Sequence, residues 1–288
     1  MRFTFCMKRL FLLSLFVIAI TETPAQYFDS LSIVNSNWRK ERIAKGVKLY
    51  SKHFSDKSLF KSNQYITYLE IKRGAGVFDI AADPKVLKKT SEFANENDAI
   101  AAINGNFFDI KNGGAVDYTK KDGKVININR NSSGYGLAFH QKAAVVIHNG
   151  KPDIIKWDGF VNWEENLKEE HVMLNGPLLI LDHKTEKLDS GSFNLTRHPR
   201  TAFGITKRGR AIMLVVDGRN INSNGLSNFE LAKVMRWLKC RSAINFDGGG
   251  STTLWVKGKG VMNHPADNAK WDHAGERRVA NILFLRKK

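Results

Sequence analysis

The sequence predicts a single α+β domain built on a mostly antiparallel sheet flanked by a few helices. Short apolar runs, many of them alternating apolar and polar positions, are separated by Asn-Gly, Asp-Gly and Gly-Lys turns, which is typical of antiparallel strands. Hydrophobic residues make up 42% of the chain, which is enough apolar mass for one large core. No Pro-rich or Gly/Ser-rich run marks a linker.

The N-terminal segment has the pattern of a secretory signal peptide. Arg2, Lys8 and Arg9 precede the apolar run 10–20, and small residues follow up to Ala25. An apolar run of about 11 residues is shorter than the roughly 20 that a membrane-spanning helix needs. We therefore expect a signal peptide over 1–25 cleaved near Ala25, a secreted or periplasmic protein, and no stable membrane span.

The charge of the chain is strongly basic. It has 45 Lys and Arg against 28 Asp and Glu, a formal net charge of +17. For an exported protein this charge favours anionic glycans or envelope polymers as partners, and we expect no nucleic acid. Removal of the signal peptide leaves Cys240 as the only cysteine, which excludes an intramolecular disulfide. The oligomeric state is not readable from these features.

The N-terminal part of the mature chain contains a predicted hairpin. Residues 26–44 form a polar lead-in, and 46–54 and 65–72 alternate apolar and polar positions as half-buried strands do. We expect these two strands to pair antiparallel. This divides the mature chain into a lead-in and hairpin over 26–70 and a larger main part over 71–288.

Two helix-to-strand units follow the same plan. A predicted helix over 85–97 leads to a buried strand at 99–103. A second helix, which a Ser-x-x-Glu capping box begins at Ser227, runs to about Lys239 and leads to a strand at 243–246. The first strand ends in Ala-Ile-Asn-Gly-Asn and the second in Ala-Ile-Asn-Phe-Asp, so the two polar strand ends are expected to lie side by side.

The remaining predicted elements are strands. Residues 116–181 are expected to hold several short antiparallel strands, and 201–205 pairs with 211–216. A last strand is expected at 279–285.

Polar side chains gather at the ends of four predicted strands, where a rigid scaffold can display functional groups. Turn chemistry alone explains any one of these clusters, but four together indicate a site. The clusters are Asn104 to Asp109, His198 to Thr201, Asp217 to Arg219, and Asp247 to Thr253.

The sharpest local signal is Asp247 followed by Gly248, Gly249, Gly250 and Ser251. Three consecutive glycines indicate a positive φ or the close approach of another group, and successive amides are suited to cradle an anion. The segment is not a nucleotide P-loop, because no Gly-Lys-Ser/Thr follows it. Zinc-binding and serine-esterase signatures are also missing from the sequence.

Arg200 and Arg219 adjoin apolar strands that would hold them rigidly, and a guanidinium suits phosphate. The alternative role of each is a structural ion pair with Asp217 or Asp247. The oxygens of these two carboxylates also suit magnesium or calcium, so a divalent metal is possible although the sequence requires no cofactor.

In their order and combination these motifs resemble the phosphodiester glycosidase family over about residues 71–285. The resemblance does not extend to the cysteine-rich and membrane-spanning C-terminal parts of the animal member, and Asn106 stands where a glycine is common. The segments that carry the resemblance are 104–108, 175–177, 200–204, 217–219, 225–226 with 230–232, 243–253, and 278–281.

The resemblance implies hydrolysis of a sugar-1-phosphodiester, such as one of N-acetylglucosamine, at the glycosidic carbon. Asp247 is assigned as nucleophile or base and Asp217 as the second carboxylate, because an oxocarbenium-like transition state needs such groups. The implied substrate-binding residues are Arg200, Arg219 and Arg278 for phosphate, Asn104 and Asn175 for sugar hydroxyls, and the loop Gly248, Gly249, Gly250 and Ser251.

Two other functions fit the same residues. One is a non-catalytic binder of anionic polysaccharide in exopolysaccharide assembly, which would use the arginines and the glycine loop. The other is a metal-dependent phosphodiesterase that cleaves the phosphorus–oxygen bond.

Overall fold

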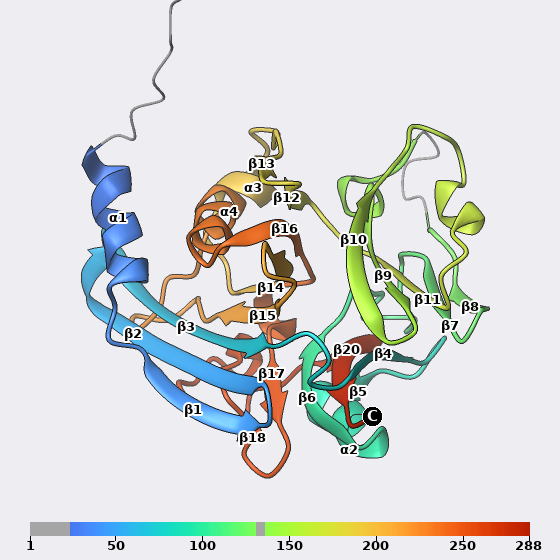
Figure 1. The fold of residues 1–288 in the computed structure, drawn as a ribbon, viewed down its shortest axis with the longest axis horizontal. Helices are drawn as coiled ribbons and strands as arrows, with labels where there is room; N and C mark the ends of the chain where they lie inside the picture. The colour runs from blue at the N-terminus through green and yellow to red at the C-terminus, as the bar shows by residue number, and fades with distance from the viewer. Residues whose placement is uncertain (1–23, 131–135) are drawn as a thin grey trace, which may run out of the picture.

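Three antiparallel sheets surround one core in the computed structural model, which describes residues 24–130 and 136–288 (Figure 1). The predicted α+β class with mostly antiparallel sheet is therefore confirmed. Residues 1–23 of the predicted signal peptide lie outside the described residues. Within the described ranges, no helix is both long and apolar enough to cross a membrane.

The largest sheet joins the N-terminal hairpin to the last third of the chain. The predicted antiparallel pair is confirmed as β2 and β3, and β3 in turn pairs with β15. In order across the sheet the strands are β1 (Arg39–Ala44), β2 (Val47–Leu59), β3 (Ser62–Ile71), β15 (Ala211–Val216), β14 (Arg200–Thr206), β16 (Cys240–Asn245), β12 (Leu178–Leu181) and β13 (Lys184–Thr185).

Two five-stranded sheets complete the frame. One consists of β18 (Gly260–Val261), β17 (Leu254–Val256), β6 (Ala99–Asn104), β20 (Asn281–Arg286) and β4 (Val77–Ala82). The other consists of β10 (Lys151–Lys156), β9 (Ala143–His148), β11 (His171–Leu174), β7 (Thr119–Lys121) and β8 (Lys124–Asn127). A small pair joins β5 (Lys88–Lys89) to β19 (Arg278–Val279).

The helices are few and short. The α-helices are α1 (Pro24–Val34), α2 (Thr90–Glu96), α3 (Ser192–Leu195) and α4 (Asn228–Trp237). The 3-10 turns are η1 (Phe139–Gln141), η2 (Trp163–Asn166), η3 (Gly249–Ser251) and η4 (Ala266–Asn268). The predicted lead-in over 26–44 therefore contains most of α1 and all of β1.

One predicted helix starts too early and the other is confirmed. The prediction of a helix from residue 85 is wrong, because the Asp83 carboxylate accepts the Lys85 and Val86 amides in a turn and β5 then pairs with β19. For α4, the Ser227 hydroxyl accepts the Glu230 amide at 3.2 Å and the Glu230 carboxylate accepts the Ser227 amide at 2.9 Å. This is the predicted capping box.

The main core lies between the three sheets, and alternation along the strands sorts side chains into layers. On β15, Met213 and Val215 face this core, whereas Ile212 and Leu214 pack in a second cluster with α4. In Figure 1 the hairpin of β9 and β10 faces β16 and β14 across the core. The strands therefore give the core two ends, at which loops meet.

Candidate active site

The ends of β6 and β16 lie side by side, as the repeated motif predicts. The Asn104 side-chain amide donates to the Asp247 carbonyl at 2.7 Å, and the Asp247 amide donates to the Gly105 carbonyl at 3.1 Å. The Asn104 side-chain oxygen accepts the Thr201 hydroxyl at 2.7 Å and the Thr253 amide at 3.1 Å. Asn104 is fully buried, so the structure places it as a link between two sheets rather than as a residue open to a sugar.

Gly105 allows this close approach. A Cβ at this position would lie 1.9 Å from the Asn281 side-chain oxygen, which accepts the Asn106 amide at 3.0 Å. The Asn106 side chain accepts from Asn281 at 2.6 Å and donates to the Thr119 hydroxyl at 3.0 Å. Asn106 therefore ties the strand end to β7.

The glycine loop folds differently from the predicted anion cradle. Gly249 has the expected positive φ, +61°, but its amide donates to the Pro199 carbonyl at 2.9 Å. The Gly248 amide donates to the Asp247 carboxylate at 2.9 Å, and the Ser251 amide donates to the Gly248 carbonyl at 3.2 Å. These three amides therefore already bond to protein oxygens, and the Gly248 amide helps to fix the Asp247 carboxylate.

Asp247 has a strongly perturbed acidity. Burial raises its pKa to about 6, and the Asp117 carboxylate acts in the same direction. The Ser251 side chain, the Gly248 amide and the Arg277 cation oppose this rise. A carboxylate with a pKa near 6 is mostly ionised at neutral pH and still basic enough to accept a proton, which suits a catalytic base or nucleophile.

A second buried carboxylate, Asp117, lies in the electrostatic range of Asp247 and holds a histidine. One Asp117 carboxylate oxygen lies 2.7 Å from His140 Nδ1 and accepts the Gln141 side-chain amide at 3.1 Å. Burial raises the pKa of Asp117, and His140 is the largest opposing influence. Sequence reasoning missed both residues, because neither lies in a Gly-rich or Arg-containing motif.

Asp217, the predicted second carboxylate, is also fully committed to protein partners. Its oxygens accept the His264 amide at 3.0 and 3.1 Å and the Asn263 side-chain amide at 3.0 Å, and one lies 2.8 Å from His264 Nδ1. Burial raises the pKa of Asp217. The His264 ring stacks on Trp271, with ring centroids 3.9 Å apart. The structure thus places Asp217 as the support of a histidine that sequence reasoning missed.

Arg219 is the predicted phosphate ligand that the structure leaves open. Its side chain is exposed, and no hydrogen bond or ion pair links its guanidinium to another described residue. Its Nη2 lies 3.0 Å from the position that a Cβ on Gly249 would take, so the cation covers the glycine loop. Together with burial and Arg200, this cation lowers the pKa of His198. His198 is therefore mostly neutral at pH 7.

Arg200 is a structural cation and is not open to phosphate. Its partners are backbone carbonyls, whereas the alternative considered from the sequence was an ion pair with a carboxylate. Arg200 is 1% exposed. Its guanidinium donates to the carbonyls of Leu226 at 2.9 Å, Phe193 at 2.8 Å and Thr196 at 3.0 Å. These bonds hold the chain between α3 and α4 and keep the side chain buried.

Of two adjacent arginines, the structure brings Arg277 and not Arg278 to the loop. Arg278, the predicted phosphate ligand, forms an ion pair of 2.7 Å with Glu92 on α2. Arg277 Nη2 lies 2.5 Å from the position of a Cβ on Gly250, and Arg277 Nε donates to Asp267 at 2.8 Å. Because the two arginines are adjacent in sequence, sequence reasoning could not determine which of them lies at the glycine loop.

Asn175 lies next to the residues around His140. It is fully buried, and neither atom of its side-chain amide has a hydrogen-bond partner among the described residues. The following Gly176 packs so tightly that a Cβ there would lie 2.6 Å from the Phe139 carbonyl. The structure thus keeps the predicted substrate residue near the site but beneath its surface.

Half-buried aromatic rings line the His140 side. The Phe107 ring lies 4.8 Å from His140 and 6.0 Å from Phe193, and Phe139 lies 4.6 Å from Phe193, measured between ring centroids. Such rings offer an apolar face to the C–H groups of a sugar ring. In residues 24–130 and 136–288, no three His, Cys, Asp or Glu side chains group as a metal site.

The family model described as phosphodiester glycosidase matches residues 97–286. The chain belongs to the phosphodiester glycosidase family. The matched range includes Asp117, His140, Arg219, Asp247 and Arg277, so the cluster built above lies within the family domain.

Two comparisons place the chain among known proteins by sequence. It is 28% identical over 214 residues to N-acetylglucosamine-1-phosphodiester alpha-N-acetylglucosaminidase of Bos taurus, covering 67% of this chain and 38% of that protein. It is 25% identical over 197 residues to the enzyme of that name from Homo sapiens, covering 62% and 36%. The chain thus spans less than two fifths of the length of these relatives.

A solved structure shares the fold. The zebrafish N-acetylglucosamine-1-phosphodiester alpha-N-acetylglucosaminidase catalytic domain, auto-inhibited by its pro-peptide, matches with a TM-score of 0.64 and 18% identity, covering 88% of this chain and 89% of that one. A hypothetical protein from Synechocystis also matches with a TM-score of 0.64, at 15% identity, covering 87% and 64%. Both likenesses concern the fold.

The two arginines are expected to respond differently to replacement by lysine. Arg200→Lys should lower the free energy of unfolding by about 2 kcal/mol, because one ammonium cannot reproduce three guanidinium bonds to buried carbonyls. Arg219→Lys is the matched control and should leave stability within about 0.5 kcal/mol of the unaltered protein. Urea unfolding measures both; equal stabilities for the two variants would contradict the structural role of Arg200.

Proposed function

We propose that this protein hydrolyses the glycosidic bond of a sugar-1-phosphodiester, with Asp247 as nucleophile or general base. The main observation behind this proposal is the Asp247 carboxylate, whose pKa is about 6. The glycine turn holds this carboxylate in place, and the open Arg219 cation lies over the turn. Membership of the phosphodiester glycosidase family supports this reaction class. Ionised carboxylate and free cation are the two charges that such a reaction needs.

The bond that breaks joins the anomeric carbon of the sugar to a phosphate oxygen. The phosphate leaves with the bonding electron pair as a phosphomonoester, and the sugar passes through an oxocarbenium-like state. Asp247 either attacks the anomeric carbon, after which water releases the sugar, or accepts a proton from the attacking water. In both cases the water oxygen ends on the sugar, and the activity requires the ionised form of Asp247.

Arg219 is proposed to bind the departing phosphate. A guanidinium offers two parallel N–H donors to phosphate oxygens and keeps its charge at all physiological pH values. The described structure provides Arg219 with no carboxylate partner, so a substrate phosphate does not have to displace an ion pair. Its position over Gly249 brings the positive charge to the turn that fixes Asp247.

His140 is proposed as the second proton-carrying group, in place of Asp217. The Asp117 carboxylate beside Nδ1 fixes the ring orientation, while Nε2 remains for exchange of a proton. Asp217 is less suited, because its oxygens are held by Asn263 and His264. Since a phosphomonoester is already a good leaving group, His140 is needed less for leaving-group protonation than for proton movement from water.

The substrate proposed is an N-acetylglucosamine-1-phosphodiester or a close analogue in an envelope or extracellular glycan. The names of the Bos taurus and Homo sapiens relatives support the sugar and the linkage for those proteins. The half-buried rings of Phe107, Phe139 and Phe193 supply a stacking surface for it. Export rests on the basic, apolar and small-residue pattern of residues 1–25.

The bond cleaved can be identified with UDP-N-acetylglucosamine as a model sugar-1-phosphodiester. We expect the purified protein in oxygen-18 water to release N-acetylglucosamine that carries the heavy oxygen, detected by mass spectrometry. Asp247→Asn should reduce the rate by at least about a hundredfold, because the reacting carboxylate is lost.

Heavy oxygen in the phosphate product would contradict cleavage at the sugar carbon and favour the metal-dependent phosphodiesterase. No turnover of this substrate or of a panel of related diesters, with sugar-phosphate binding retained, would favour the non-catalytic polysaccharide binder. Unchanged turnover by Asp247→Asn would remove this residue from the reaction.

Arg219→Gln and Arg278→Gln form a matched pair for phosphate binding. Loss of the open cation in Arg219→Gln should lower kcat/KM about tenfold or more, because a charge-assisted hydrogen bond to phosphate is lost. Arg278→Gln removes an exposed ion pair with Glu92 and should stay within about twofold. Steady-state kinetics on the same diester measures both, and the reverse order would return Arg278 to the phosphate site.

A further inference from the structure

A cavity lies at the opposite end of the core from Asp247. Strand β14 runs from Arg200 near the candidate active site to Ile205, which lines this cavity of about 490 Å³. Five residues of strand span roughly 16 Å at about 3.3 Å per residue. Arg241 marks the cavity end of β16, whose other end leads to Asp247. The two locations are therefore separated by the packed core.

The walls of the cavity come from different sheets that are bonded to each other. The β9–β10 turn packs against β4, where the Phe78 amide donates to the Gly150 carbonyl at 3.0 Å, and a Cβ on Gly150 would lie 2.5 Å from Val77 Cγ1. The third wall is the β14–β15 turn, over which the Arg73 side chain passes, its Cδ lying 3.9 Å from the position of a Cβ on Gly209. These contacts make the cavity pre-formed.

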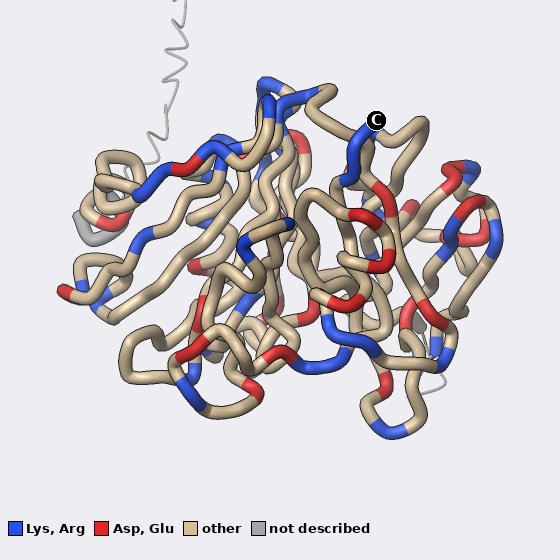
Figure 2. Tube along the Cα trace, turned by 90° about the horizontal axis from the view of Figure 1, so that it is seen from below, with Lys and Arg blue, Asp and Glu red and all other residues tan. Residues whose placement is uncertain are grey.

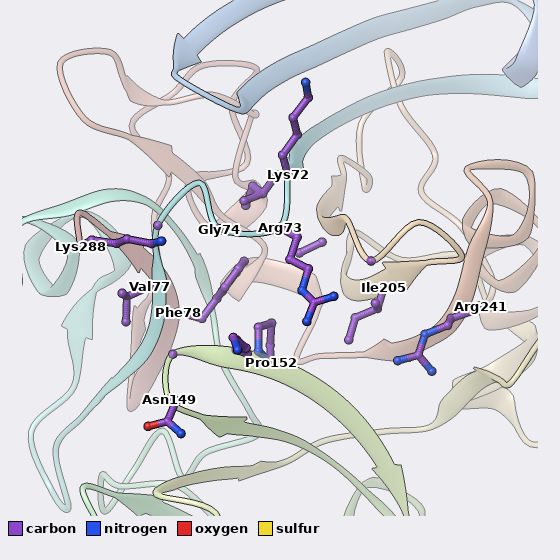
Figure 3. Close-up of a pocket in the computed structure, with 16 residues that line it drawn as sticks. Lys72, Arg73, Gly74, Val77, Phe78, Asn149, Pro152, Ile205, Arg241 and Lys288 are labelled. Carbon is purple, nitrogen blue, oxygen red and sulfur yellow. The ribbon is translucent and has the colours of Figure 1, made fainter.

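The lining combines cations with an apolar floor. Phe78, Pro152 and Ile205 form part of the floor, and Figure 3 shows the Arg73 guanidinium projecting into the space between Phe78 and Ile205. The five basic residues of the lining are Lys72, Arg73, Lys151, Arg241 and Lys288, and no acidic residue is among the described residues that line it. Figure 2 shows basic residues gathered in the part of the molecule that holds the C-terminal end.

Three of these cations are not neutralised within the described chain. Arg241 forms ion pairs with Asp153 at 3.1 Å and Asp182 at 3.3 Å, and in Figure 3 the Lys72 side chain points away from the cavity. Arg73, Lys151 and Lys288 have no ion pair to any described residue. Unpaired like charges around one concave surface repel each other, and an anion bound there relieves that repulsion.

We propose that this cavity binds a small amphiphilic anion, a phosphate or sulfonate group joined to an apolar body. Arg73 and Lys151 hold the anionic group, and Phe78, Pro152 and Ile205 contact the apolar body. Phosphate and sulfonate match the guanidinium fork, and removal of the floor from water requires an apolar part that inorganic phosphate lacks. The volume lies within the roughly 300–1,000 Å³ of ligand pockets.

The test uses 8-anilinonaphthalene-1-sulfonate, an anion with an apolar body, as a fluorescent probe of the folded protein. We expect saturable binding at one site, with a dissociation constant about tenfold higher in Arg73→Ala and in Lys151→Ala. Arg236→Ala and Lys124→Ala remove exposed cations elsewhere and serve as matched controls that keep the affinity. Thermal unfolding of each variant verifies that it is folded.

Competition experiments and variants identify the chemistry of the ligand and the location of its binding site. Hexyl phosphate should displace the probe at a concentration at least about tenfold lower than inorganic phosphate does, because hexyl adds apolar contact. Equal potency of the two, or unchanged probe affinity in both cavity variants, would overturn the proposal. The two sites should be independent, so Asp247→Asn should keep the probe affinity and Arg73→Ala should keep hydrolysis. Loss of probe binding in Asp247→Asn would place the probe in the glycosidase site and overturn the proposal.

Vesicles separate the two sources of such an anion. Co-sedimentation with phosphatidylglycerol vesicles, but not phosphatidylcholine vesicles, that is lost in Arg73→Ala would support a lipid headgroup as the ligand. Displacement of the probe by hexyl phosphate without vesicle binding would support a soluble ligand.

Discussion

The contact between the ends of β6 and β16 is the constraint on which the site depends. The Asn104 side chain makes three hydrogen bonds, to the Asp247 carbonyl, the Thr201 hydroxyl and the Thr253 amide. These partners belong to two different sheets, so a single buried amide fixes the position of the Asp247 loop relative to the whole frame. Hydrogen bonds made by a buried amide contribute to rigidity as well as stability, and Gly105 leaves the space for this contact.

The same constraint explains the chemistry expected of Asp247. The sheets hold the carboxylate in a position largely removed from water, which raises its pKa, while the Gly248 amide and the Arg277 cation keep the ionised form accessible at neutral pH. A looser loop would admit water and return the acidity to that of an ordinary aspartate. Neutral partners thus set the position of the Asp247 carboxylate, and charged partners adjust its pKa.

The sequence predicted the fold class, the β2–β3 and β14–β15 pairs and the adjacency of the two polar strand ends, because these follow from local periodicity and repetition. The start of α2 could not be predicted, since β5 pairs with β19 from the far end of the chain. Which arginine is open was likewise undetermined, because burial of Arg200 depends on three carbonyls from two other segments, the end of α3 and the start of α4. The Asp117–His140 pair exists only through tertiary contact.

The half-buried Asp247 carboxylate is expected to titrate near neutrality. Carbon-13 NMR of protein labelled at the aspartate carboxyl carbons, with the Asp247→Asn variant to assign the signal, measures this titration directly. We expect a pKa of about 6 for Asp247. In Arg277→Gln this pKa should rise further, because a cation that favours the ionised carboxylate is lost. A pKa near the ordinary value of about 4, unaffected by Arg277→Gln, would contradict it.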